Sequence, residues 1–184
     1  MFSRIIEYME KTTKKNGKIW VLRIVLTIAC IFAFAWIFSN SLKTGEQSSA
    51  QSHAVTKAVQ DTAKVVAPSS KVATATGEDY DILHSLIRSI AHFSEFAVLG
   101  ALLAWCYLSY TRQKAFFVLP IGLIVLTPIV DETLQISTGG RGAEMKDILL
   151  DTAGGLLGAL CAVVLVWLVF ALCQRRRRKR GNRV

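Results

Sequence analysis

Four long apolar runs constrain the fold of this chain more than any other feature of its sequence. The first run, residues 19–38, carries a single charge, Arg23, near enough to its end for the head group to reach the membrane surface. The others cover residues 86–110, 115–131 and 148–173. Each is long enough to cross a bilayer as a helix. Because the runs are continuous and not alternating, we expect an all-α integral membrane protein, a four-transmembrane-helix bundle, and not a barrel.

The composition agrees with one small membrane domain. The 184 residues are 52% hydrophobic, with a mean hydropathy of +0.40, which is high for a soluble domain. The four cysteines lie in or at the ends of apolar runs, and none forms a CxxC pair. We therefore interpret them as packing or lipid-facing residues and predict no disulfide or catalytic thiol.

Two polar segments flank the first run. Residues 1–18 are basic, and a basic leader is also typical of a signal peptide. The apolar run is longer than a usual signal region, and no clear small-x-small site closes it before Ser39, so we expect a retained span. Residues 39–85 form a long polar segment. Small apolar residues recur in it at helical spacing from about 46 to 66, which predicts an amphipathic helix that ends before Pro68.

The distribution of basic residues predicts the orientation of the bundle. Fourteen lie in the N-terminal segment, the turn at 111–114 and the tail at 175–184, whereas seven lie in the segments on the other side. We therefore expect both termini in the cytoplasm and residues 39–85 outside. The same topology accounts for the arginine-rich tail, which should lie against anionic lipid headgroups, so we predict no nucleic-acid partner.

Ionisable residues inside predicted spans are the candidate functional residues. Arg88, His92 and Glu95 share one face of the second span, at 100° per residue. Such residues usually face a bundle interior or a wet cavity. With the predicted topology, they lie at the outer membrane face together with residues from the third and fourth spans, namely Asp131, Glu132, Gln135, Asp147 and Asp151.

The glycines of the fourth span indicate which helix it approaches. Gly154, Gly155 and Gly158 give the small-residue spacing that lets two helices pack closely in membranes. Packing alone explains these glycines. Close approach on the same face would nevertheless bring Asp151 toward another helix, and the second span with His92 is the natural candidate.

This set of residues allows several kinds of chemistry. The candidates for proton transfer are His92 with Glu95 or Asp151. The candidates for ligand binding, in which arginines hold an anionic group, are Arg88, Asp131, Glu132, Gln135, Arg141 and Asp147. We predict no metal and no cofactor. A divalent cation bound by His92, Glu95 and two aspartates stays an alternative, although H-x-x-E is common by chance. A structural ion-pair network that fixes helix register is another.

The motifs resemble the VanZ-like family. They are FSNS at the end of the first span, RSIAHFSEFAVLG, DETLQ, a GGRG loop and KDILLDTAGGLLG, in this order over roughly residues 36–165. The family's polar residues and glycines correspond to Arg88, His92, Glu95, Gly100, Asp131, Glu132, Gln135, Arg141, Asp147, Asp151, Gly154 and Gly158. The family often has Pro-Gly-Arg in the loop, where this chain has Gly139-Gly140-Arg141.

The resemblance implies a cell-envelope membrane protein of a Gram-positive-type bacterium, and the family's namesake is linked to resistance to the glycopeptide teicoplanin. We expect an outward-facing polar pocket that binds or modifies an anionic lipid headgroup, a lipid-linked envelope precursor or a lipoglycopeptide. One alternative is a non-enzymatic interaction or scaffold protein. A transporter is a third alternative. It would need polar groups along the full depth of the bundle, and the inner halves of the predicted spans lack them. The sequence specifies neither a reaction nor an oligomeric state.

Overall fold

The computed structural model describes residues 17–110, 118–138 and 144–181. Within these ranges the chain forms helices joined by short connections, without strands. The helices are α2 (Gly17–Ser41), α3 (Gly45–Val66), α4 (Lys71–Thr74), α5 (Glu78–Tyr110), α6 (Val118–Ser137) and α7 (Met145–Gly181). Four of them, α2, α5, α6 and α7, are long and apolar enough to cross a membrane. The predicted all-α membrane fold with four spans is confirmed.

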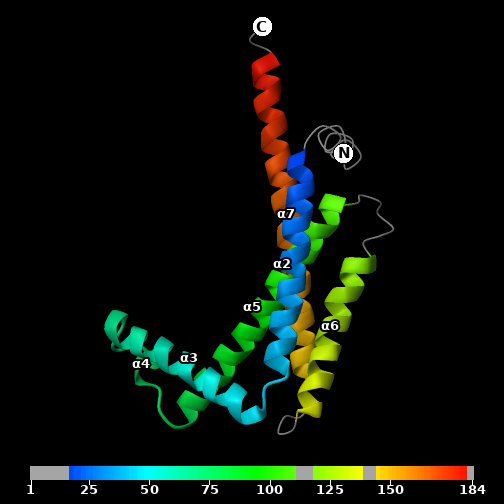
Figure 1. Cartoon of the computed structure of the whole chain (residues 1–184). Coiled ribbons are helices and arrows are strands. Elements are labelled where there is room, and N and C mark those ends of the chain that lie inside the picture. The colour runs from blue at the N-terminus through cyan, green and yellow to red at the C-terminus, as the bar shows by residue number, and fades with distance from the viewer. Residues whose placement is uncertain (1–16, 111–117, 139–143, 182–184) are drawn as a thin grey trace.

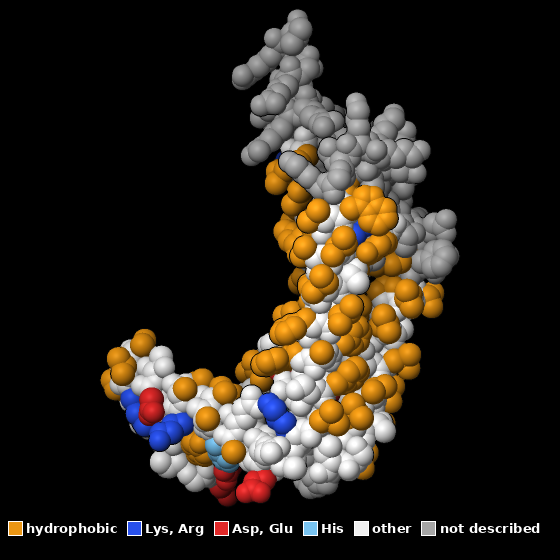
Figure 2. Space-filling model, in the orientation of Figure 1, with side chains coloured by type: hydrophobic (Ala, Val, Ile, Leu, Met, Phe, Trp, Pro, Cys, Tyr) orange, Lys and Arg blue, Asp and Glu red, His pale blue; other side chains and the backbone are white. Residues whose placement is uncertain are grey.

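The four long helices stand side by side, and α3 with α4 projects from one end as an arm (Figure 1). Hydrophobic side chains cover much of the column of long helices in Figure 2. Among them, Trp20 and Phe32 on α2 are 63% and 68% exposed. Apolar exposure on this scale is far larger than a soluble monomer tolerates, and it fits helices whose outer surface contacts lipid tails.

The helices extend beyond the predicted spans. α5 begins at Glu78, eight residues before the predicted span, and α6 continues to Ser137 through the polar DETLQ motif. α7 begins at Met145 and continues to Gly181. Hydropathy marks the apolar part of a helix, whereas the backbone hydrogen-bond ladder continues as long as the dihedral angles allow. The polar ends are therefore helical turns that carry the candidate site residues.

The arm begins with a local sequence signal. Thr44 caps α3: its side chain accepts a hydrogen bond from the Gln47 backbone, while the Gln47 side chain accepts one from the Thr44 backbone. The observed α3 coincides with the predicted helix to within one residue. Beyond α3, the segment interpreted as a linker contains α4 and a turn at Gly77, whose φ of 57° lies in the left-handed region that favours glycine.

The closest packing in the bundle is between α5 and α7. A Cβ atom built at Gly158 would overlap the backbone carbonyl of Ala97, and one built at Gly100 would overlap the backbone of Gly155. Gly154 lies against Phe93 in the same way. The two helix backbones are therefore in direct contact along this interface, which small residues permit in membrane helices.

At the end of the bundle opposite the arm, one charged side chain among the described residues, that of Arg23, lies within a span. The Arg23 Nε donates a hydrogen bond to the Ser109 carbonyl at 2.9 Å. Its guanidinium lies 5.4 Å and 5.1 Å from the ring centroids of Trp20 and Tyr110. Within the described residues, these contacts on α2 and α5 hold the guanidinium without an ion pair. Arg23 is therefore part of the bundle packing as well as near the end of the first span.

Candidate functional site

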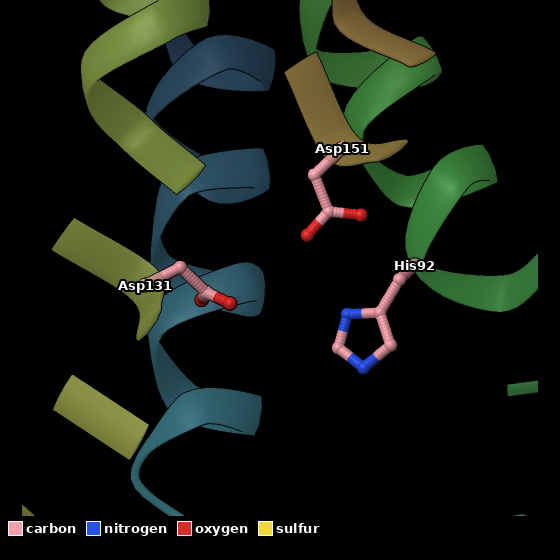
Figure 3. A group of neighbouring side chains, drawn as sticks. All are labelled: His92, Asp131 and Asp151. Atoms are coloured by element: carbon pink, nitrogen blue, oxygen red, sulfur yellow. The ribbon is translucent and has the colours of Figure 1, made fainter. Parts of the chain in front are cut away.

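Three side chains from three helices converge at the end of the bundle that carries the arm. They are His92 on α5, Asp131 on α6 and Asp151 on α7, and Figure 3 shows them pointing toward one another. One donor atom of each lies within 4.8 Å of the others. We call these residues the convergent cluster. The sequence predicted that His92 and Asp151 would meet, and the structure brings them together.

Asp131 is fixed by hydrogen bonds from two sides. The Ser41 hydroxyl at the end of α2 donates to its Oδ1. The Gln135 Nε2, one helical turn later, donates to its Oδ2 at 2.7 Å. The Asp131 side chain is buried. Two donors hold this carboxylate in one orientation.

Asp151 is buried beside the α5–α7 interface. It is 2% exposed, and its Oδ1 has no hydrogen-bond partner within the described residues. Gly154 lies almost one helical turn further along α7, in contact with Phe93, the neighbour of His92. The glycine contact therefore places Asp151 next to His92. A buried carboxylate oxygen without a partner is costly, so this atom requires an explanation.

Glu95 makes its hydrogen bonds to α2 and is not one of the three residues of the convergent cluster. Its Oε1 accepts hydrogen bonds from the Trp36 Nε1 at 3.1 Å and the Asn40 Nδ2 at 3.2 Å, both on α2. Glu95 therefore joins α5 to α2. Its proposed part in proton transfer stays a prediction, but a cation site built on His92 and Glu95 does not match this placement.

A polar pocket of about 100 Å³ lies between α2, α3 and α5. Its walls include Lys43, Gln51, Arg88, His92 and Glu95. The Lys43 Nζ donates hydrogen bonds to Asn40 at 2.8 Å and Gln51 at 2.7 Å. Within the described residues, neither Lys43 nor Arg88 forms an ion pair. His92 belongs to both the pocket and the convergent cluster, so the two are adjacent.

The other predicted site residues lie around this centre. Glu132 is buried, and its Oε2 accepts a hydrogen bond from the Glu144 backbone at 3.3 Å, which ties the end of α6 to the start of α7. Asp147 is half-buried in the first turn of α7, where a negative charge is favoured by the helix dipole. Arg141 lies outside the described residues, as do most of the basic N-terminal segment and the turn at 111–114.

Sequence reasoning missed the contribution of the first span and the arm. Trp36, Asn40 and Ser41 contact site carboxylates, and Lys43 and Gln51 line the pocket. The FSNS motif was the available signal, because it contains two of these residues at the end of the first span. Their partners depend on how helices cross, which the motif does not specify.

The arrangement places two chemistries side by side. The convergent cluster offers one imidazole and two carboxylates, which can hold a proton or a cation. The polar pocket offers the Lys43 ammonium and the Arg88 guanidinium, which form no ion pair within the described residues and can hold an anion beside the Glu95 carboxylate.

Comparison with known proteins gives one result. A family described as VanZ/LLP1 matches residues 25–170, which is 146 of the 184 residues and includes all four apolar helices in whole or large part. No curated protein and no solved structure matches the chain.

Proposed function

The chain belongs to the VanZ/LLP1 family, and we propose that it is a cell-envelope membrane protein whose polar pocket binds an anionic lipid headgroup or a lipid-linked envelope precursor. The pocket would lie on the outer side of the membrane, as the distribution of basic residues predicts. The envelope would be of the Gram-positive type that the family resemblance implies.

The observation that carries the proposal is the pair of cationic groups in one pocket. Lys43 and Arg88 line it, and neither forms an ion pair within the described residues. The guanidinium can bind a phosphate through two parallel hydrogen bonds, and the ammonium can add a point charge. An anion at this position would make charge-assisted contacts with groups that the bundle already brings together.

The size of the pocket limits what it can hold. Its volume of about 100 Å³ is below the roughly 300–1,000 Å³ typical of sites that enclose a whole small molecule. A phosphate or a small headgroup fits this space, with the rest of a lipid outside it. A complete lipoglycopeptide such as teicoplanin does not, so a link to resistance would act through an envelope lipid or precursor.

Any proton transfer at the bound headgroup would use His92. Its imidazole lines the pocket on one side and adjoins Asp151 in the convergent cluster on the other. A carboxylate beside the ring fixes its tautomer and orientation. The proposal requires binding only, and a reaction would be an addition to it.

The test measures lipid retention by the purified full-length protein. Native mass spectrometry would compare phosphatidylglycerol with zwitterionic phosphatidylcholine. We expect selective retention of the anionic lipid, and Arg88→Gln and Lys43→Gln should each weaken it about tenfold, since a hydrogen bond to a charged group contributes about 1.5–3 kcal/mol. Lys57→Gln is the matched control, because Lys57 is an exposed lysine on α3. Equal retention of both lipids, or equal loss in all three variants, would contradict the proposal.

A structural role of the polar residues is the second candidate. Two interhelical contacts favour it: Glu95 joins α5 to α2, and Asp131 joins α6 to α2. Under this alternative, Glu95→Ala and His92→Ala should both reduce the yield of folded protein. Normal folding of His92→Ala with loss of lipid retention would support a binding site instead.

A further inference from the structure

The convergent cluster has the composition and geometry of a cation site. His92, Asp131 and Asp151 come from α5, α6 and α7, and one donor atom of each lies within 4.8 Å of the others. Ligands bound at about 2.1 Å in a tetrahedral arrangement are roughly 3.4 Å apart. The observed donors therefore need to approach by little more than 1 Å.

A second observation, independent of this clustering, is the Asp151 carboxylate. It is 2% exposed, and its Oδ1 has no hydrogen-bond partner within the described residues. In Figure 3 this carboxylate points toward the space between His92 and Asp131. Burying a carboxylate oxygen without a donor is unfavourable, and a cation in that space would provide the missing partner.

The surroundings of Asp131 resemble the outer shell of a metal ligand. Ser41 donates to its Oδ1 and Gln135 to its Oδ2. Hydrogen bonds of this kind orient ligating carboxylates and sharpen metal affinity. They also come from α2 and α6, so the geometry of the cluster depends on the whole bundle.

The donor set selects the kind of cation. An imidazole nitrogen favours zinc and other transition metals over Mg²⁺ and Ca²⁺, whereas two carboxylates and no thiolate suit Zn²⁺ or Mn²⁺ better than soft metals. Two carboxylates also neutralise the charge of one divalent cation. Three protein ligands leave at least one position open, as in zinc sites that bind a further ligand.

We propose that His92, Asp131 and Asp151 bind one divalent transition-metal cation, Zn²⁺ or Mn²⁺, whose open position takes a phosphate oxygen from the adjoining polar pocket. This inference deepens the proposed function and rests on it, because His92 lines both the cluster and the pocket. The cation and the Arg88 guanidinium would then bind one anion from two sides.

The first experiment measures cation binding without any lipid ligand. The full-length protein in detergent would be stripped with a chelator, and Zn²⁺ and Mn²⁺ would be titrated by calorimetry, with bound metal counted by elemental mass spectrometry. We expect one cation per chain and a higher thermal midpoint when it is bound. Asp151→Asn and His92→Gln should weaken binding at least tenfold, whereas Asp81→Asn, an exposed carboxylate on α5, should not.

Folding of the variants is checked separately, by circular dichroism and by their thermal midpoints in chelator. If the wild-type protein binds no cation, or if folded Asp151→Asn binds one as tightly as the wild type, the metal site is refuted. Weakened binding confined to the two cluster variants would establish the site.

The second experiment separates this inference from the proposed function. Retention of phosphatidylglycerol would be measured with chelated and with cation-loaded protein. Stronger retention by the loaded protein supports both proposals. Cation binding without anionic-lipid selectivity would leave the metal site and refute the lipid role, whereas selective retention without any bound cation would do the reverse.

Discussion

The two sides of α5 differ in how they are packed. On one side, glycines bring the backbone of α7 into direct contact, so that even one added methyl group at Gly158 would overlap Ala97. On the other side, α2 packs against α5 through an apolar core that includes Ile37 and Phe96. At the end that carries the arm, α2 and α3 contact α5 through polar side chains such as Glu95, and a pocket of about 100 Å³ remains between them. The first interface has no spare volume, whereas the second can adapt.

This difference assigns different tasks to the two interfaces. The α5–α7 contact fixes the backbone positions of His92 and Asp151, because backbone atoms in direct contact cannot shift independently. The α2 and α3 side closes the pocket with side chains that can change rotamer when a ligand enters. A rigid interface beside an adaptable one is a suitable arrangement for a binding site, since the chemistry is preorganised while entry stays possible.

The largest effect should come from breaking the rigid side. Gly158→Ala places a methyl group on the Ala97 carbonyl, and we expect it to destabilise the bundle by more than about 2 kcal/mol as α5 and α7 separate. Gly122→Ala is the matched control, because a Cβ at Gly122 meets no atom within 4 Å. It should be neutral or stabilising by up to about 1 kcal/mol, as alanine is the better helix former. Unfolding in mixed micelles would measure both, and equal midpoints would show that the α5–α7 contact is not close.

The next effect should have the opposite sign. Asp151→Asn removes a buried carboxylate whose Oδ1 has no partner within the described residues, and the amide keeps its shape. In chelated protein we expect stabilisation by about 1–3 kcal/mol, because burying an unpaired charge costs more than burying a neutral amide. Without chelator, the variant should bind the cation more weakly. Thermal unfolding in chelator measures the change in stability. Destabilisation of the chelated variant would mean that the carboxylate stabilises the rigid side.

The sequence predicted the fold better than it predicted the partners of each side chain. Apolar runs gave the four spans, and glycine spacing indicated the meeting of His92 with Asp151. The sequence grouped Glu95 with His92, because the two lie three residues apart on one helix face. In the structure both line the polar pocket, but Glu95 also hydrogen-bonds to Trp36 and Asn40 on α2, which the sequence did not predict. Partners across helices depend on crossing angles and axial shifts, to which hydropathy and spacing are insensitive.

A smaller effect should follow from removing the hydrogen bond by which Ser41 of α2 holds Asp131 of the convergent cluster. Ser41→Ala removes the α2 donor to Asp131 while Gln135 still donates. We expect about a tenfold loss of cation affinity, the lower end of what outer-shell changes cause, and a destabilisation of about 1 kcal/mol. Calorimetric titration would measure the affinity. Ser137→Ala is a suitable control, because its exposed hydroxyl bonds only to the Leu134 carbonyl within α6. An unchanged affinity would show that Asp131 does not depend on α2.

The smallest effect should come from the arm. His53 on α3 stacks on His84 of α5, with ring centroids 3.9 Å apart, and its Nδ1 lies 3.3 Å from the Tyr80 hydroxyl. His53→Ala removes these contacts, each of which contributes well under about 1.5 kcal/mol, so the thermal midpoint should change little. Because α3 forms one wall of the pocket, we expect faster hydrogen exchange in α3 and a two- to threefold loss of lipid retention. Thr62→Ala, whose exposed hydroxyl bonds only to Ala58, should change neither. If hydrogen exchange in α3 is unchanged, the arm is held by its contacts with α4 and its cap at Thr44. The interface of α2 and α3 with α5 would then be more rigid than its polar contacts indicate.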